Sequence, residues 1–109
     1  MKYLCLVYME DPAAIADSEC IACGVALREN GKMIGGEALQ PIHTATTVRV
    51  RNGKLAVTDG PFAETKEQLA GFYLIDARDL NDAIQVAAKI PPARVGSIEV
   101  RPVRELDAN

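Results

Sequence analysis

The sequence predicts an α+β fold in which helices cover one face of an antiparallel sheet. Two short runs, YLCLVY at residues 3–8 and GFYLI at residues 71–75, are continuously apolar, as is typical of strands buried on both faces. Each run is followed by a segment with helix-capping signals. Between them, two alternating segments flank Asn52-Gly53. This dipeptide indicates a hairpin, because a type I′ turn needs positive φ at both central residues.

The helices are predicted from their ends. Asp11-Pro12 offers an N-cap and a first-turn proline, so a first helix is expected from there through Arg28, ended by Asn30-Gly31. Asp79 is expected to cap a second helix, with Pro91-Pro92 as its stop. The residues expected on the core face of this second helix are Leu80, Ala83, Ile84 and Ala87.

The strands are predicted from apolar runs and from alternation. Gly35 and Gly36 loosen the second strand and indicate a bulge or a close backbone approach. In the last strand, Ile98 and Val100 are expected to face inward. The predicted strands are residues 3–8, 32–39, 46–50, 54–58, 71–75 and 97–103.

The order strand, helix, strand, hairpin, strand, helix, strand matches the split βαβ plan of a ferredoxin-like domain with a hairpin added in the middle. A single domain over residues 1–109 is expected. In this plan the two continuous apolar strands are neighbours at the centre of the sheet. Because helices cover only one face, the open face needs a partner, and a homodimer is expected.

Charge and hydropathy exclude some classes of partner. The chain has 12 Lys plus Arg against 15 Asp plus Glu, a net charge of -3, so no basic surface is available for nucleic acid. The N-terminal apolar run is too short for a signal peptide or a membrane span. No membrane association and a cytoplasmic location are therefore expected.

Three cysteines are an odd number in a chain without an export signal, so Cys5, Cys20 and Cys23 are expected to be reduced thiols. Cys20 and Cys23 have the CxxC spacing of redox dithiols and zinc knuckles, but a zinc site needs four ligands. The alternative is core packing, because both share one helix stripe with Gly24 and Leu27. The sequence also has no Gly-rich phosphate loop and no nucleophile motif, so no metal or cofactor is expected.

Asp59, Glu37 and His43 are the candidate catalytic residues. His43 is the one side chain of a type that ordinarily titrates near neutrality, and it is either a general base or an exposed loop residue. Asp59 precedes Gly60-Pro61, where the chain must reverse. Its carboxylate either accepts hydrogen bonds from the amides of the turn or converges with Glu37 as an acid and base pair.

Other side chains near this loop are expected to frame it. Phe62 is expected to anchor the loop by burying its ring, and Arg49 and Arg51 to share the outer face of the hairpin. There the two arginines pair with acids or bind an anionic ligand. Of Phe72 and Tyr73, one is expected to face the helices and the other the open face of the sheet.

The segment TDGPFAETKEQLAGFYLID at residues 58–76, preceded by GGEALQP and TATTVRVRNGK, resembles the DGPF branch of the YCII-related family. The resemblance covers nearly the whole chain. It implies a dimeric, ferredoxin-like fold of the α+β barrel type in small bacterial proteins whose functions are mostly unassigned. Some relatives are encoded beside extracytoplasmic-function sigma factors, and one distant branch is similar to a dehalogenating lyase of aromatic catabolism.

In the wider family a histidine on the first helix and an aspartate are proposed as an acid/base pair. By the resemblance, that histidine position falls at Cys20, so the pair is not expected in this chain.

Three functions are therefore left open. The first is a dimeric small-molecule-binding protein with a pocket between the sheet and the 58–70 loop. The second is a cofactor-independent lyase or isomerase that uses Asp59, Glu37 or His43 as acid and base. The third is an interaction module that acts on a sigma factor, which the resemblance alone suggests.

Overall fold

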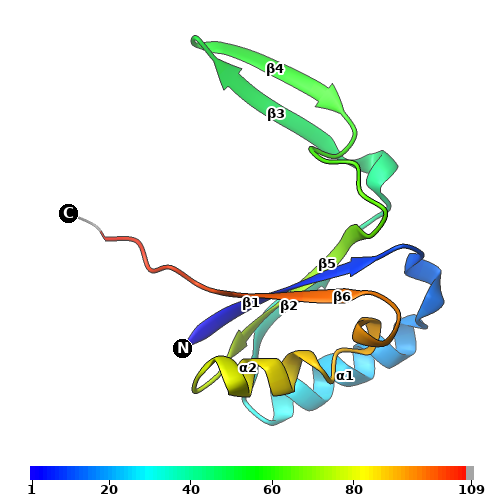
Figure 1. Cartoon of the computed structure of the whole chain (residues 1–109), viewed down its shortest axis with the longest axis vertical. Helices are drawn as coiled ribbons and strands as arrows, with labels where there is room; N and C mark the ends of the chain where they lie inside the picture. Colours follow the sequence, from blue (N-terminus) through cyan, green and yellow to red (C-terminus); the bar gives the residue numbers. More distant parts are fainter. Residues whose placement is uncertain (108–109) are drawn as a thin grey trace.

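The computed structural model describes residues 1–107, so the last two residues of the expected 1–109 domain lie outside the described residues. Within residues 1–107, four strands form an antiparallel sheet in the order β2-β5-β1-β6, and two more form a separate hairpin (Figure 1). The sheet consists of β1 Lys2–Met9, β2 Met33–Ala38, β5 Gln68–Asp76 and β6 Ser97–Pro102, and the hairpin of β3 Thr46–Arg51 and β4 Lys54–Asp59.

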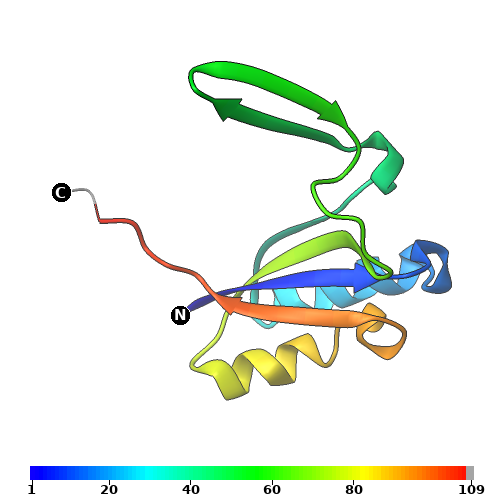
Figure 2. The same ribbon diagram turned by 45° about the horizontal axis from the view of Figure 1, so that its top comes forward.

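Two helices complete the ferredoxin-like plan that the order of elements predicts. Helices α1 Asp17–Glu29 and α2 Leu80–Ala87 lie on the same face of the sheet (Figures 1 and 2). The two continuous apolar runs form β1 and β5, which pair with each other at the centre of the sheet. The predicted α+β fold class is therefore confirmed.

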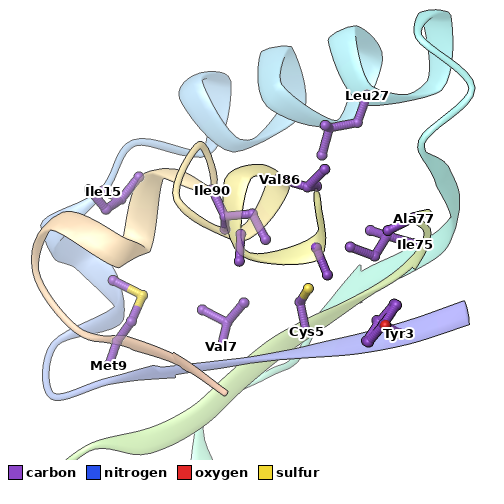
Figure 3. Packing of buried hydrophobic residues seen from close by; sticks show 12 residues of the cluster. Tyr3, Cys5, Val7, Met9, Ile15, Leu27, Ile75, Ala77, Val86 and Ile90 are labelled. Atoms are coloured by element: carbon purple, nitrogen blue, oxygen red, sulfur yellow. The ribbon is translucent and has the colours of Figure 1, made fainter. Parts of the chain in front are cut away.

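Alternation along β1 places one side of that strand in the core. Tyr3, Cys5, Val7 and Met9 are buried, while the residues between them are partly exposed. Ile98 and Val100 of β6 pack against this core, as predicted, so one face of the sheet is apolar from edge to centre. On the helix side the buried β1 side chains meet Ile15, Leu27, Ile75, Val86 and Ile90 (Figure 3).

The first helix begins later than the sequence predicts. The Asp11 carboxylate accepts a hydrogen bond from the Ala13 amide at 2.9 Å, but it caps a short 3₁₀ turn, η1 Pro12–Ala14. Ile15 then returns to an extended conformation, with φ of -120° and ψ of 132°, and buries its side chain. The predicted continuous helix from Asp11 is wrong, because burial of Ile15 in the core overrides the local capping signal.

The predicted end of α1 is confirmed. Gly31 has a φ of 70°, and its amide donates to the Arg28 carbonyl at 3.0 Å. The Lys32 amide donates to the Leu27 carbonyl at 2.8 Å. These two bonds form a Schellman motif, in which the left-handed position favours glycine.

Asp79 caps α2 as predicted, since its carboxylate accepts a hydrogen bond from the Asp82 amide at 2.8 Å. The predicted core face of this helix is only half right, because Leu80 and Ile84 are 51% and 47% exposed. The helix instead turns Asp82 inward, where its carboxylate pairs with the Lys32 ammonium at 2.9 Å. The buried residues of α2 are Asp82, Ala83, Val86 and Ala87.

The hairpin forms where predicted but stands apart from the sheet. Asn52 and Gly53 have φ of 53° and 73°, as a type I′ turn requires. The two strands pair from Thr46 opposite Asp59 to Arg51 opposite Lys54. The hairpin projects away from the sheet on the side opposite the helices (Figures 1 and 2).

Candidate functional site

A cavity of about 570 Å³ lies between α1 and the part of the sheet formed by β2 and β5. This volume falls within the range of roughly 300–1,000 Å³ that is usual for small-molecule sites. Most of the side chains that line the cavity are apolar. They include Val7, Met9, Ile15, Ile21, Val25 and Met33.

Small residues on both walls explain why this space is open. On α1 the lining includes Cys20 and Gly24, and on the sheet it includes Gly36, Ala38 and Ala70. A larger side chain at position 24 would enter the gap between helix and sheet, whereas at Gly36 a Cβ would lie 2.7 Å from the Phe72 carbonyl oxygen, so the close approach of the two strands there requires glycine. The core is therefore hollow beneath α1, whereas Ala83, Val86 and Ala87 of α2 are buried in it.

The predicted cysteine stripe on α1 faces the sheet, but only part of it enters the core. Leu27 is 5% exposed, whereas Cys20 and Cys23 are half-buried and pack against the core. The Cys23 thiol donates a hydrogen bond to the Lys89 carbonyl at 3.6 Å, and Cys20 lines the cavity. All three cysteines are free thiols, as predicted.

Tyr73 and Cys20 supply polar groups to the cavity wall. Burial, with smaller contributions from Cys23 and Cys20, raises the pKa of Tyr73 to about 12. Burial also raises the pKa of the Cys20 thiol, with smaller contributions from the Asp17 and Glu19 carboxylates. Both groups are therefore neutral hydrogen-bond donors at neutral pH. No hydrogen bond within residues 1–107 involves the Tyr73 hydroxyl, which leaves it available to a ligand.

Glu37 is the predicted site residue that belongs to the lining of the cavity. It pairs with Phe72, and its neighbour Gly36 pairs with Tyr73. Because Tyr73 packs against the core on the helix side, alternation places the Glu37 and Phe72 side chains on the open face. The expected division of Phe72 and Tyr73 between the two faces is thus confirmed, and Glu37 borders the cavity without directing its carboxylate inward.

His43 and Asp59 lie at the base of the hairpin, outside the cavity lining. His43 is exposed in a 3₁₀ turn, η2 Ile42–Thr44, and Asp59 is the exposed last residue of β4. The Gly60 amide donates to the Ala45 carbonyl at 2.7 Å and so ties the two segments together. Within residues 1–107, no hydrogen bond joins the two side chains, and the Asp59 carboxylate accepts none from the turn amides.

Phe62 does not anchor its loop, so that prediction is wrong. Its side chain is 78% exposed, and the Arg49 guanidinium lies 5.4 Å from the ring centre. The hairpin stands away from the sheet (Figure 2). The predicted shared face of Arg49 and Arg51 is confirmed, because they pair across the hairpin with Ala56 and Lys54.

The cavity wall is mostly apolar, with the neutral donors Tyr73 and Cys20 and the charged residues Asp17, Arg28 and Glu37 in its lining. Within residues 1–107, no three His, Cys, Asp or Glu side chains gather closely enough to hold a metal ion. In the same part of the chain, no helix has the length and apolar content needed to cross a membrane.

Tyr73 and Cys20 are not predicted as site residues from the sequence, because an apolar strand and a helix stripe both indicate core. The signal that points to them is the match of small residues on two elements, Cys20 and Gly24 on α1 opposite Gly36 on β2. That match is visible only once the two elements are known to face each other.

The fold and the cavity define a ferredoxin-like α+β protein with an apolar hollow beneath its first helix. The YCII-related domain matches residues 1–107, and the chain belongs to this family. An uncharacterized protein of Rhizobium meliloti (strain 1021) is 48% identical over 77 residues, which are 69% of this chain. The match spans 62% of the length of that relative, whose name assigns it no activity.

Proposed function

We propose that this chain is a single-domain, homodimeric small-molecule-binding protein of the DGPF branch of its family, and that its ligand occupies the cavity beneath α1. The observation that carries the proposal is the cavity of about 570 Å³ with largely apolar walls and an unpaired Tyr73 hydroxyl. Of the expected 58–70 loop, only Ala70 lines this cavity, so the proposed pocket lies beneath the helix and not beneath the loop.

The walls and donors favour one class of ligand. An apolar cavity binds a molecule with mostly apolar surface, and a few placed polar groups determine its orientation. Because Tyr73 and Cys20 are neutral donors, they favour a neutral acceptor such as a carbonyl oxygen. The ligand is therefore a small, uncharged, predominantly apolar molecule that carries a carbonyl group.

The open face of the sheet supports the proposed homodimer. Leu4, Leu6 and Tyr8 of β1 pair with Leu74, Phe72 and Leu69 of β5 on the face that no helix covers. A contiguous apolar face of this kind on a small domain is typical of an interface between subunits.

Acetophenone and ethylbenzene provide a matched pair of probes, because they are similar in size and only the first has a carbonyl. Met9 and Met33 line the cavity, whereas Met1 does not. We expect acetophenone to shift the methyl NMR signals of Met9 and Met33 and to leave that of Met1 in place. Tyr73→Phe should weaken acetophenone binding about threefold to tenfold, the effect of one hydrogen bond, and leave ethylbenzene binding unchanged.

A pair of leucine substitutions on α1 tests the location. Gly24→Leu places a side chain in the cavity, where a Cβ at residue 24 meets only the Met33 sulfur at 3.7 Å. Ala22→Leu makes the same change at an exposed residue outside the cavity lining. Gly24→Leu should reduce the affinity for both probes at least about tenfold while Ala22→Leu does not. Equal affinities in the two variants, or no shift of Met33 with either probe, would contradict the proposal.

The acid/base role of Asp59, Glu37 and His43 stays a prediction. The base of the hairpin holds His43 and Asp59 near one another in the chain fold, while Glu37 lies in the main sheet. Turnover that disappears in Asp59→Asn, with the fold intact, would support the lyase or isomerase hypothesis. The action on a sigma factor also stays a prediction, and co-purification with such a factor would support it.

A further inference from the structure

The hairpin, residues 46–59, forms an arm whose two faces differ sharply. On one face, Val48 pairs with Val57 and Val50 with Leu55. The opposite face carries the positive charges. The four apolar side chains are between 59% and 68% exposed. The cations of the opposite face are Arg49, Arg51 and Lys54.

An arm of this kind needs a partner surface. An isolated two-stranded hairpin is at best marginally stable in water, and four exposed aliphatic side chains on one face add an unfavourable contact with solvent. The chain as a whole is extended. Its radius of gyration is 15.7 Å, whereas a compact domain of this length has about 13 Å, and the projecting arm contributes to this difference.

Hydrogen bonds close the base of the arm where it leaves the sheet. The Gly60 amide donates to the Ala45 carbonyl at 2.7 Å, and the Thr47 hydroxyl donates to the Gly60 carbonyl at 2.9 Å. On the other side of the base, the Leu39 amide donates to the Ala70 carbonyl at 2.8 Å. The arm stands away from its own sheet (Figures 1 and 2), so within this chain its apolar face is exposed and another molecule is needed to cover it.

The same chain carries a second uncovered apolar surface, the open face of the sheet around Leu6 and Phe72. The arm strands have six residues each and span about 20 Å, similar to the strands of the sheet. The open sheet face of a second copy can thus cover the apolar face of the arm, and the arm can cover that sheet face.

We propose that in the homodimer the apolar face of each arm packs on the open sheet face of the other copy. This inference rests on the proposed homodimer and specifies its geometry. The contact is isologous, because the same two surfaces meet twice about a two-fold axis. Each copy then clasps the other, and both uncovered apolar surfaces are buried by one association.

Two adjacent substitutions on β4 test the clasp. Leu55→Lys places a charge on the apolar face, and Ala56→Lys places the same charge on the opposite face of the same strand. Both positions are exposed, so both variants should fold, which circular dichroism checks. Sedimentation equilibrium should show dimer dissociation at least about tenfold stronger in Leu55→Lys, and a change within about twofold in Ala56→Lys.

Photo-crosslinking tests the partner surface directly. With Leu55 replaced by p-benzoylphenylalanine, mixed dimers of ¹⁵N-labelled and unlabelled protein should crosslink between copies, from position 55 to residues 4–8 or 69–74. Crosslinks between two arms, or within one chain, would overturn the proposed clasp while leaving the dimer in place. A protein that is monomeric at all concentrations would contradict both the homodimer and the clasp.

Discussion

At the scale of single residues, burial decides what each cysteine can do. Cys5 is fully buried between β5 and β6, and burial raises its pKa from 9.0 to about 11. Cys20 and Cys23 are partly exposed, and burial is also the first cause of their raised pKa. The thiol form therefore predominates at all three positions at neutral pH, which argues against a reactive dithiol.

Alkylation should separate the three thiols. A pKa of about 11 reduces the thiolate fraction of Cys5 about a hundredfold relative to a pKa of 9.0, and burial blocks access to it. With iodoacetamide at pH 8, we expect Cys20 and Cys23 to react first and Cys5 to react at least about a hundredfold more slowly than in urea. Mass spectrometry of timed samples measures this, and equal rates in folded and unfolded protein would contradict it.

At the scale of elements, Asp82 fastens α2 to the start of β2. Its carboxylate accepts hydrogen bonds from the Arg78 amide at 3.0 Å and from the Lys32 ammonium at 2.9 Å. These bonds, with the Arg78 amide contributing most, hold the pKa of Asp82 well below its usual value of 3.8. The residue is 8% exposed, so its charge is stabilised by this set of partners and not by bulk water.

The lowered pKa of Asp82 predicts a loss of stability in acid. Because the folded-state pKa is below the unfolded value near 3.8, the stabilisation is complete above that value and is lost as the pH falls toward the folded-state pKa. Asp82→Asn should lower Tm by several degrees at pH 7, and the difference from the natural chain should shrink as the pH falls below about 4.

Asp76→Asn is the matched control for this test. Asp76 pairs with the N-terminal ammonium at 3.0 Å, but its side chain is 61% exposed, so its removal should change Tm little. Thermal unfolding followed by circular dichroism at several pH values measures both variants. A constant difference between Asp82→Asn and the natural chain from pH 7 to pH 2 would contradict the assignment.

At the scale of the whole molecule, the chain has two uncovered apolar surfaces and a hollow. The open sheet face and the arm lie on the side away from the helices (Figure 2). The cavity lies beneath α1. The proposed ligand site and the proposed dimer contact therefore lie on opposite faces of the sheet. We expect a substitution on the arm to weaken the dimer without changing the affinity of the cavity for its ligand.

A dimer that unfolds to separate chains has a concentration-dependent stability. We expect Tm to rise by roughly 3–5 °C for each tenfold increase in protein concentration. Leu55→Lys should reduce this dependence, and Ala56→Lys should preserve it. Differential scanning calorimetry over a hundredfold range measures the effect, and a Tm independent of concentration in the natural chain would contradict the homodimer.

Local patterns predict much of the fold because the physics behind them is local. The Asn52-Gly53 turn, the glycine that ends α1 and the Asp79 cap all depend on a few neighbouring residues, and all three are confirmed. The central positions of β1 and β5 are also confirmed, but the predicted burial on both faces is wrong within this chain, because β1 alternates buried and partly exposed residues and no helix covers its second face.

Predictions that depend on distant contacts are the ones that fail. Ile15 interrupts the first helix because the core needs its side chain, and α2 turns because Asp82 meets Lys32, which lies 50 residues away in the sequence. Phe62 is exposed because the hairpin stands away from the sheet. The spacing of neighbouring residues in the sequence does not indicate which distant residues will come into contact.

The sequence by itself therefore determined the class of fold, the order of the strands and the family. Only the tertiary structure decided where the space for a ligand lies, because the cavity arises from small residues on α1 and on β2 that are far apart in the chain. It likewise decided that the arm stands away from the sheet with its apolar face uncovered. Burial is a property of surfaces that meet, and which surfaces meet is settled by the packing of the whole chain.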